Sequence, residues 1–379
     1  MNETTVSENV TMTTTPFLNT TPTVMTTTEA TAGDAMDMEM ATKMHYYTST
    51  VLGTIFVIVG IIGNILSILV WRRKKMWSST GTYLIGQAIV DIGLLVFFFI
   101  TDSLTQMAPS IKTTYSYGVF FSYIGFPIFF LFVVCSIWYT VGVTVDRYIH
   151  VCWFNHAKDM CSVKRALTGL GIITTLCFII NIPHFASYEP VANDNGSSTE
   201  AGFKPTEYGA GEGSKHYEFW VHCMFLVLAP WASIFILNML IIQKVSSMNR
   251  HMEEKRGSSG KVKAKKSEAQ MTRMLLTVTF TFLVLIAFQC ITQCFFMLAA
   301  GNHRIVSEAF SIAKLGVVIN SSINFFLYSL SAKRFRKELR VVLCARLEKD
   351  TDRSTSYSMS HTTSSSANSS TKLNSVSKR

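Results

Sequence analysis

The sequence predicts an all-α membrane protein, a bundle of seven transmembrane helices followed by a short amphipathic helix. First, 49% of the residues are hydrophobic and only 15% are charged, whereas soluble domains carry about 25% charged residues. Second, seven apolar runs reach the length of about 20 residues that crosses a bilayer. Third, lysine and arginine concentrate between alternate runs, which is typical of membrane topology. Although the net charge is +10, we expect no nucleic-acid partner, because the basic residues do not lie on a folded soluble domain.

Residues 1–47 precede the first apolar run and are rich in threonine and methionine. Such a segment has too little apolar surface to fold, so we expect a disordered tail. Asn-x-Ser/Thr triplets predict glycosylation of this tail if it is extracellular, at Asn2, Asn9 and Asn19. The first apolar run comes too late and is too long for a cleaved signal peptide.

Residues 48–330 hold the seven runs, and each should be a helix because lipid cannot satisfy exposed backbone polar groups. Their approximate bounds are 48–71, 81–104, 119–149, 165–187, 218–243, 272–300 and 305–330. Basic residues follow the first run, precede the fourth, separate the fifth from the sixth and follow the seventh. These connections are therefore predicted to be cytoplasmic and the amino terminus extracellular, with the lipid bilayer as a partner. The outer connection 188–217 is acidic and carries a fourth glycosylation triplet at Asn195.

Residues 331–345 follow the last run and place apolar side chains at helical spacing among basic ones. This pattern predicts an amphipathic helix lying on the membrane surface. Cys344 at its end is either palmitoylated or a plain buried thiol. Residues 346–379 are rich in serine and threonine, and we expect a disordered cytoplasmic tail that accepts phosphate. None of the eight cysteines falls firmly in an extracellular segment, so no disulfide is predicted.

Charged and polar residues inside the runs are candidate functional sites, because burying them in lipid is costly. The third run ends in Asp146-Arg147-Tyr148, and the second contains the isolated carboxylate of Asp91. Oxygen-bearing side chains that can surround Asp91 occur in other runs: Asn64, Ser136, Asn320 and Asn324. Lys314 in the seventh run either snorkels to the interface or pairs with an anion. The candidate anions are Asp102, Glu308 and a group of the ligand.

With seven runs around them, these motifs resemble rhodopsin-like (class A) G-protein-coupled receptors over residues 48–345. Residues 320–328 match the family's helix 7 motif, except that Phe325 stands where the family has proline. Residues 151–157 and 161–166 make the chain similar to invertebrate FMRFamide-type neuropeptide receptors.

The resemblance implies a receptor of the plasma membrane that activates a heterotrimeric G protein when the sixth helix moves. Arrestin would bind the phosphorylated tail. The implied switch residues are Asp146, Arg147, Tyr148, Glu268, Asn324 and Tyr328. The implied sodium site is centred on Asp91 with Ser136, Asn320 and Asn324. Two alternatives remain open: a neutral Asp91 in a polar core, and Glu268 as a solvated charge rather than a latch for Arg147.

The resemblance also places a ligand pocket between the outer halves of the helices. Its candidate residues are Lys314, Asp102, Tyr123, Phe126, Phe129, Phe130, Gln289 and Gln293. For any single phenylalanine, ordinary helix packing is the alternative. A peptide ligand is expected from the resemblance and by elimination. The third run lacks the aspartate of amine receptors, and Val318 replaces the Schiff-base lysine of opsins. The other interpretation is an orphan or constitutively active receptor with a non-peptide small-molecule ligand.

Several features of the family are missing. Ser122 stands where a helix 3 cysteine is usual, and 188–217 contains no cysteine to pair with it. Phe288 replaces the proline that kinks helix 6, and Asn238 replaces a helix 5 tyrosine, while Pro230 is retained.

The sequence does not predict an enzyme. It lacks the His-Glu-x-x-His, Gly-x-Ser-x-Gly and P-loop motifs. His150, His156 and Cys161 share one inner loop, but their spacing is not that of a metal site. Many transporters contain internal repeats, and this sequence shows no such duplication, so a transporter is not predicted.

Overall fold

The computed structural model describes residues 40, 42–191, 202–254, 259–297 and 303–344, most of them helical. The chain divides into two units, Met1–Ser331 and Ala332–Arg379. The predicted glycosylation sites Asn2, Asn9, Asn19 and Asn195 lie outside the described residues, as does the tail 346–379.

Seven helices in the described part of the chain are long and apolar enough to cross a membrane, which confirms the predicted bundle. They are Thr42–Trp71, Ser79–Met107, Tyr115–Cys152, Val163–Ala186, Glu212–Ser247, Thr272–Gln289 and Ser311–Ser331. The polar tail is shorter than predicted, because residues 42–47 already belong to the first helix and His45 is buried. Composition placed these residues in the tail, whereas their partners on other helices hold them in the bundle.

The first three spans contain α-helices joined to π-helical turns. They are built from η1 (Tyr46–Leu52) and α2 (Gly53–Trp71), then α3 (Ser79–Phe98), η2 (Phe99–Ser103) and α4 (Leu104–Met107), then α6 (Tyr115–Phe120), η3 (Phe121–Gly125) and α7 (Phe126–Cys152). Short helices lie in two connections: α5 (Pro109–Lys112) and α8 (Phe154–Met160). Single π-turns are rare and occur often at functional sites.

The remaining elements complete the bundle and its connections. They are α9 (Val163–Asn181), η4 (Ile182–Ala186), β1 (Tyr188–Pro190), β2 (Phe203–Pro205), α10 (Glu207–Ala210), α11 (Glu212–Glu218), η5 (Phe219–Leu228), α12 (Ala229–Glu254), α13 (Ser259–Met297) and α14 (His303–Ser331). Although Phe288 replaces the usual proline, α13 runs as one continuous helix past this position.

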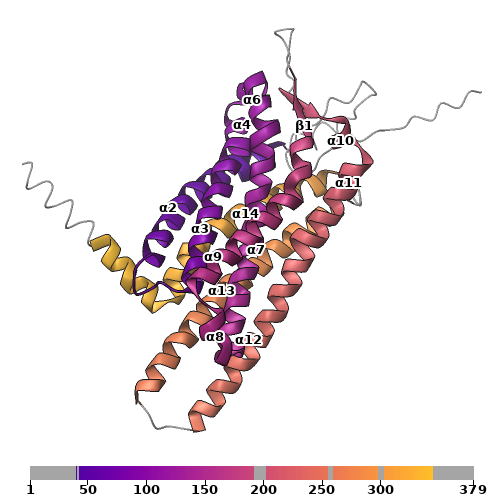
Figure 1. Ribbon diagram of the computed structural model, residues 1–379. Helices are drawn as coiled ribbons and strands as arrows, with labels where there is room; N and C mark the ends of the chain where they lie inside the picture. Colours follow the sequence, from indigo (N-terminus) through magenta and orange to yellow (C-terminus); the bar gives the residue numbers. More distant parts are fainter. Residues whose placement is uncertain (1–39, 41, 192–201, 255–258, 298–302, 345–379) are drawn as a thin grey trace, which may run out of the picture. The chain divides into compact units, whose positions relative to one another are not determined.

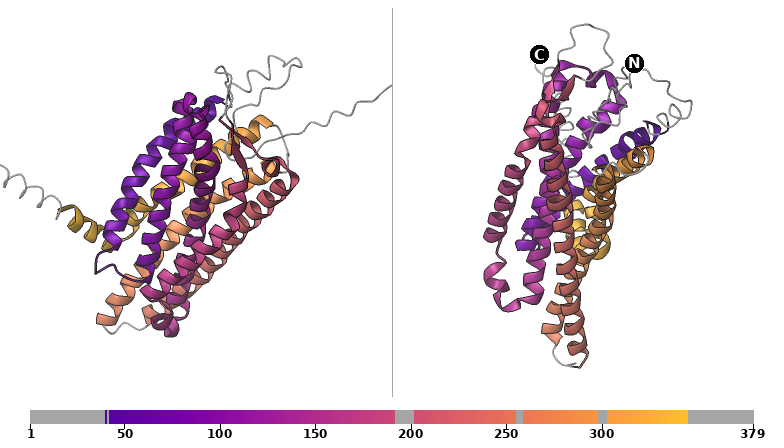
Figure 2. Two further views of the ribbon diagram at one scale, coloured as in Figure 1. Left: turned by 45° about the horizontal axis from the view of Figure 1, so that its top comes forward. Right: turned by 90° about the vertical axis from the view of Figure 1, so that its right-hand side faces the viewer.

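The long helices stand side by side in a closed arrangement (Figures 1 and 2). α14 packs against both α2 and α13, so the last span closes on the first. α7 contacts α3, α9 and α12 and forms the centre. In the apolar 18-residue stretch of Tyr115–Cys152, 61% of the residues are buried, whereas in that of Val163–Ala186 only 22% are buried. A helix that is apolar all round can occupy such a central position. We call the end of the bundle that carries β1 the hairpin end, and the end that carries α8 the α8 end (Figure 1).

The antiparallel hairpin β1–β2 covers α6 and η3 without a disulfide. Its register pairs Tyr188 with Pro205 and Pro190 with Phe203. The Phe203 ring stacks on Phe121 with 3.9 Å between centroids, and Tyr188 meets Phe121 edge-on at 5.3 Å. Such aromatic pairs contribute about 0.5–1.5 kcal/mol each beyond their buried area. Ser122, at the position of the usual cysteine, is fully buried beneath this contact.

Two glycines allow the hairpin to approach α6 closely. The Gly202 N–H donates to the Lys112 carbonyl at 2.8 Å. A β-carbon added to Gly118 would overlap the Gly202 carbonyl oxygen and lie 2.6 Å from its carbonyl carbon. Only glycine permits backbones to meet this closely. The outer lid is therefore fixed by backbone and aromatic contacts.

In the second unit, residues 333–344 form a helix, as predicted. Cys344 is exposed, which contradicts the alternative of a buried thiol. Its palmitoylation and the attachment of this helix to a membrane surface remain predictions.

Candidate functional site

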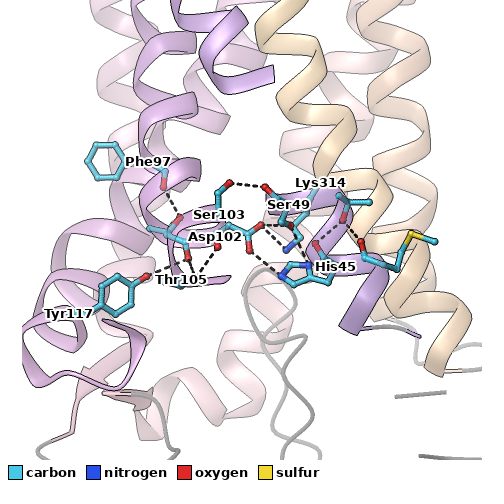
Figure 3. Close-up of polar contacts among 11 residues, drawn as sticks. His45, Ser49, Phe97, Asp102, Ser103, Thr105, Tyr117 and Lys314 are labelled. Atoms are coloured by element: carbon cyan, nitrogen blue, oxygen red, sulfur yellow. Dashed lines mark hydrogen bonds and ion pairs between the residues drawn. The ribbon is translucent and has the colours of Figure 1, made fainter. Parts of the chain in front are cut away.

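At the hairpin end, a buried ionic cluster joins the first, second and seventh spans (Figure 3). Asp102 accepts from Lys314 Nζ at 3.2 Å and lies 3.2 Å from His45 Nε2. Ser49 donates to the same carboxylate at 3.0 Å. All four side chains are buried. Of the alternatives left open for Lys314, the structure selects pairing with Asp102. We call His45, Ser49, Asp102 and Lys314 the Asp102 cluster.

The local backbone explains how Asp102 reaches this position. Asp102 lies in η2, whose wider turn buries the consecutive residues Thr101, Asp102 and Ser103. His45 directly precedes η1, and Ser49 lies within it. The Ser103 hydroxyl donates to the Ser49 carbonyl at 2.7 Å, which ties the two π-turns together. His45 is the member of the cluster that sequence reasoning missed, because the surrounding composition matched a disordered tail.

Lys112 adds a further positive charge close to this cluster. Burial lowers the pKa of Lys112 below its ordinary value, and the Asp102 carboxylate partly offsets that effect. The ammonium lies 6.0 Å from the centre of the Phe203 ring in the hairpin. The hairpin end thus has one buried carboxylate that interacts with two lysines.

The predicted aromatic lining separates into two groups. Phe126 and Phe130 are buried near the hairpin. The ring centroids of Phe126 and Tyr188 are 4.8 Å apart, and the Phe130 ring stacks on the His184 ring with 4.5 Å between centroids. Tyr123 is instead 50% exposed. Contact of Tyr123 with a ligand stays a prediction.

Three further pocket predictions remain. Phe129 is buried and meets Phe130 edge-on at 5.6 Å. Gln289 is buried, and the side chain of Gln293 lies outside the described residues. Contact of any of these with a ligand stays a prediction.

Midway along the bundle, Asp91 is fully buried within a network of hydrogen bonds. Ser136 donates to its Oδ1 at 2.7 Å, and Asn324 Nδ2 donates to its Oδ2 at 3.0 Å. Asn64 does not reach the carboxylate, since its Nδ2 donates to the Ser321 carbonyl at 2.8 Å. Asn320 lines a small adjacent cavity together with Asn324. The structure therefore brings Ser136 and Asn324 directly to Asp91, and Asn320 close by.

Gln87 is a member of this network that the sequence did not reveal. Its Nε2 donates to Asp91 Oδ1 at 3.1 Å and to Ser136 Oγ at 2.8 Å. Thr140 donates to its Oε1 at 3.4 Å. The amide nitrogen therefore bridges the two oxygens that would be the first ligands of a sodium ion. Asp91 and Ser136 have the oxygen chemistry that the ion prefers, but binding requires the Gln87 amide to move.

At the α8 end, the Asp146 carboxylate connects several groups. Arg147 Nη2 lies 3.7 Å from Asp146 Oδ2, and Thr80 donates a hydrogen bond to the same oxygen. His150 Nδ1 lies 3.6 Å from it. Burial and the Asp146 charge raise the pKa of the Cys161 thiol to about 12, so this thiol is protonated at neutral pH. The Asp146–Arg147 pair expected for the resting switch is present.

The other predicted switch residues have diverse surroundings. Tyr328 is buried and meets Trp71 edge-on at 5.7 Å. Tyr148 lies at the bundle edge, 6.2 Å from the Trp153 ring. Although Glu268 belongs to α13, its side chain lies outside the described residues, so the latch to Arg147 remains a prediction.

Two hydrogen bonds join α12 to α13. Trp231 Nε1 donates to the Leu283 carbonyl at 3.1 Å, and Asn238 Nδ2 donates to Thr279 at 2.9 Å. Asn238, which replaces the usual tyrosine, is thus fixed to the sixth span. These contacts connect the sixth span to its neighbour.

α14 carries residues of the Asp102 cluster, of the Asp91 network and of a buried aromatic contact. α14 contributes Lys314 to the Asp102 cluster, Asn324 to the Asp91 network and Tyr328 to the contact with Trp71. The arrangement can transmit a change of pairing at Lys314 along a single rigid element. This is the property required of a transmembrane switch.

The sequence pattern of the family described as "7 transmembrane receptor (rhodopsin family)" matches residues 63–328. The chain is 28% identical over 330 residues to the FMRFamide receptor of Drosophila melanogaster, covering 80% of this chain and 55% of that receptor. It is 25% identical over 336 residues to the Drosophila melanogaster sex peptide receptor, covering 80% of this chain and 74% of that one. The human galanin receptor type 1 is 24% identical over 318 residues, with 81% and 84% covered.

These matches confirm the resemblance drawn from the motifs, including its similarity to receptors of the FMRFamide type. The matched family is one of receptors, which confirms the prediction that the chain is not an enzyme. With seven spans and a family match over most of them, this multi-pass membrane protein belongs to the rhodopsin family of seven-transmembrane receptors.

Proposed function

We propose that this receptor binds an extracellular peptide at its hairpin end and activates a heterotrimeric G protein at its α8 end. The relatives of this chain support the ligand class, since they include receptors for FMRFamide, sex peptide and galanin. The alignment to the first of these covers 55% of that receptor, so activity and ligand are proposals for this chain. We place the receptor in the plasma membrane, and the distribution of lysine and arginine supports an orientation with the amino terminus outside the cell.

The Asp102–Lys314 pair is the observation that carries this proposal. A buried ion pair is a poor source of net stability, because the desolvation of both charges offsets their attraction. Its retention in the bundle is better explained by a switching role. A peptide with a cationic side chain such as arginine would compete with Lys314 for the Asp102 carboxylate. Arginine suits this role because its guanidinium can bind a carboxylate with two parallel hydrogen bonds.

Release of Lys314 would change the restraints on α14. In the structure Lys314 ties α14 to the second span at one end, and Asn324 ties it to Asp91 further along. A ligand shifts such an equilibrium only through its differential affinity for the two states. Displacement of a resident lysine provides that difference, because the ligand's cation binds Asp102 only when Lys314 has left.

At the α8 end, activation would free Arg147 from Asp146 and move α13 away from α7. Thr272, Leu275 and Thr279 of α13 line a small cavity together with Arg147. Outward movement of α13 would enlarge this cavity for a G-protein segment. Phosphorylation of residues 346–379 would add negative charge for arrestin to bind.

A sodium ion at Asp91 is proposed as a secondary regulator. The Asp91 and Ser136 oxygens would hold it after the Gln87 amide moved aside. A bound ion would supply positive charge that keeps the Asp91 carboxylate ionised. In its absence Gln87 supplies hydrogen bonds to both oxygens.

A second-messenger assay tests the proposal. Cells with calcium and cyclic-AMP reporters would express the wild-type chain, and surface protein would be measured in parallel. A neuropeptide library that includes Arg-Phe-amide peptides is then applied. We expect a peptide response that is abolished by Arg147→Ala at equal surface expression. Asp102→Asn should weaken the response to arginine-containing peptides more than Phe129→Leu does.

Two other outcomes would change the conclusion. A raised baseline without ligand that disappears in Arg147→Ala would indicate constitutive activity. No response from well-expressed surface protein would contradict a peptide ligand within the library's range and favour a small-molecule ligand.

A further inference from the structure

Beyond the proposed signalling function, three metal-binding side chains converge at the α8 end. Asp146, His150 and Cys161 each offer one ligand atom, and these atoms all lie within 4.8 Å of one another. We propose that they form a binding site for a divalent transition-metal ion, with Zn²⁺ as the best-fitting class. Such a site depends on ligand chemistry and geometry alone and does not require that the receptor signal.

The ligand set matches zinc rather than a hard cation. Thiolate, imidazole and carboxylate are the three ligand types that zinc binds in proteins, whereas calcium and magnesium prefer oxygen alone. Zinc–ligand distances of about 2.0–2.3 Å place tetrahedral ligands roughly 3.3–3.8 Å apart. His150 Nδ1 already lies 3.6 Å from Asp146 Oδ2. The three ligand atoms now lie within 4.8 Å of one another, and His150 Nδ1 is also 2.9 Å from the Asp146 carbonyl oxygen. Metal binding would draw the side chains together and replace that hydrogen bond, and a water molecule would complete the fourth position.

Secondary structure fixes the three ligands. Asp146 and His150 are four residues apart on α7, so they share one helix face. Cys161 returns to this face after α8, whose last turn is closed by a bond from Cys161 N to the Ala157 carbonyl at 2.9 Å. Its thiol lies 3.8 Å from the Asp146 carbonyl oxygen. The next residue, Ser162, caps α9 by accepting from Arg165 N at 3.3 Å. Helix ends on both sides therefore hold Cys161 in place.

From sequence spacing we expected no metal site among His150, His156 and Cys161. The structure brings Asp146, rather than His156, together with the other two side chains. Asp146 is buried, while His150 and Cys161 are partly exposed, so an ion can reach the site from the surrounding water.

Metal binding would have two direct consequences. The thiol of Cys161 would lose its proton to solvent as the sulfur–metal bond forms, since only the thiolate is a metal ligand. The Asp146 carboxylate would also be drawn from Arg147, now 3.7 Å away. The ion would tie the loop after α8 to the end of α7.

Cobalt binding to the purified full-length receptor in detergent tests the site. Co²⁺ reports a thiolate ligand through its charge-transfer absorption band, and Zn²⁺ should abolish this band by displacement. The informative variants are Cys161→Ser and His150→Ala. Matched controls come from the same region: Cys152→Ser removes a nearby thiol, and His156→Ala removes a nearby imidazole. Size-exclusion profiles confirm that each variant remains folded and monodisperse.

We expect the band in the wild type and in both controls. It should be absent in Cys161→Ser, and the cobalt affinity should fall on the order of tenfold or more in His150→Ala. Absence of a band in the wild type would overturn the proposal, as would a band that survives in Cys161→Ser. Equal cobalt affinity of the His150→Ala and His156→Ala variants would show that the His150 imidazole is not a ligand of the metal.

Discussion

Gly118→Ala should release the hairpin from α6, because the added methyl group has no space. A β-carbon at this position overlaps the Gly202 carbonyl oxygen and lies 2.6 Å from its carbonyl carbon. Ordinary van der Waals contact begins at about 3.4 Å, so the hairpin backbone must retreat by roughly 1.5 Å to clear the carbonyl oxygen. That retreat is enough to break the 2.8 Å bond from Gly202 N to the Lys112 carbonyl. It also separates the Phe203 and Phe121 rings, now 3.9 Å apart.

The expected magnitude follows from these losses. One hydrogen bond contributes about 1 kcal/mol, the aromatic pair about 1 kcal/mol, and partial exposure of Phe203 about 1–2 kcal/mol. Alanine in a helix recovers up to about 1 kcal/mol relative to glycine. The net cost of attaching the hairpin is therefore about 2–3 kcal/mol, or roughly 30–100-fold in its opening equilibrium.

Hydrogen exchange measured by mass spectrometry provides the assay. The amides of Val191 and Gly202 should lose about 30–100-fold protection in Gly118→Ala. Gly171→Ala is the matched control, since a β-carbon there meets no atom within 4 Å. If the two variants exchange alike across the hairpin, close backbone contact is not what fixes the lid.

Three further substitutions test the networks along the bundle. Lys314→Met removes one partner of the buried Asp102, so thermal unfolding in detergent should show a loss of about 3 kcal/mol. Adding Asp102→Asn should recover part of it, and additive effects would mean that the two charges are uncoupled. Gln87→Leu should strengthen the effect of sodium on thermal stability at least several-fold, with potassium as the control; an unchanged sodium effect would contradict competition for the Asp91 site. Trp231→Phe removes the bond to α13 while keeping an aromatic ring, so stability should fall by about 1 kcal/mol, whereas unchanged stability would show that this bond contributes nothing measurable.

Hydropathy was sufficient to predict the seven spans, because each span must cross the hydrocarbon core of the bilayer and therefore contains its own apolar run of sufficient length. The isolated charges Asp91 and Lys314 were found for the same reason, since a charge inside an apolar run is conspicuous. Lys314 could even be assigned Asp102 among its candidate partners. A charged residue inside a span could thus be identified from the sequence of that span alone.

The remaining features depend on contacts between spans, which a single sequence does not contain. His45 was placed in a tail because its neighbours are polar, although its partner is on another helix. Gln87 is an ordinary residue in its own helix, and only its position between Asp91 and Ser136 gives it a role.

The continuous sixth helix has a mechanical consequence. Without a proline kink, α13 can move as a stiff lever rather than bending at its middle. The hydrogen bond from Trp231 to the Leu283 carbonyl lies near the boundary between the outer and inner parts of α13. It is therefore a suitable point about which the helix can pivot. From Leu283 to Ser259 the inner arm spans about 36 Å at 1.5 Å per residue. A tilt of only about 10° would sweep its tip through roughly 6 Å. The outer arm from Leu283 to Met297 is shorter, so a small displacement near the hairpin is amplified at the other end by leverage.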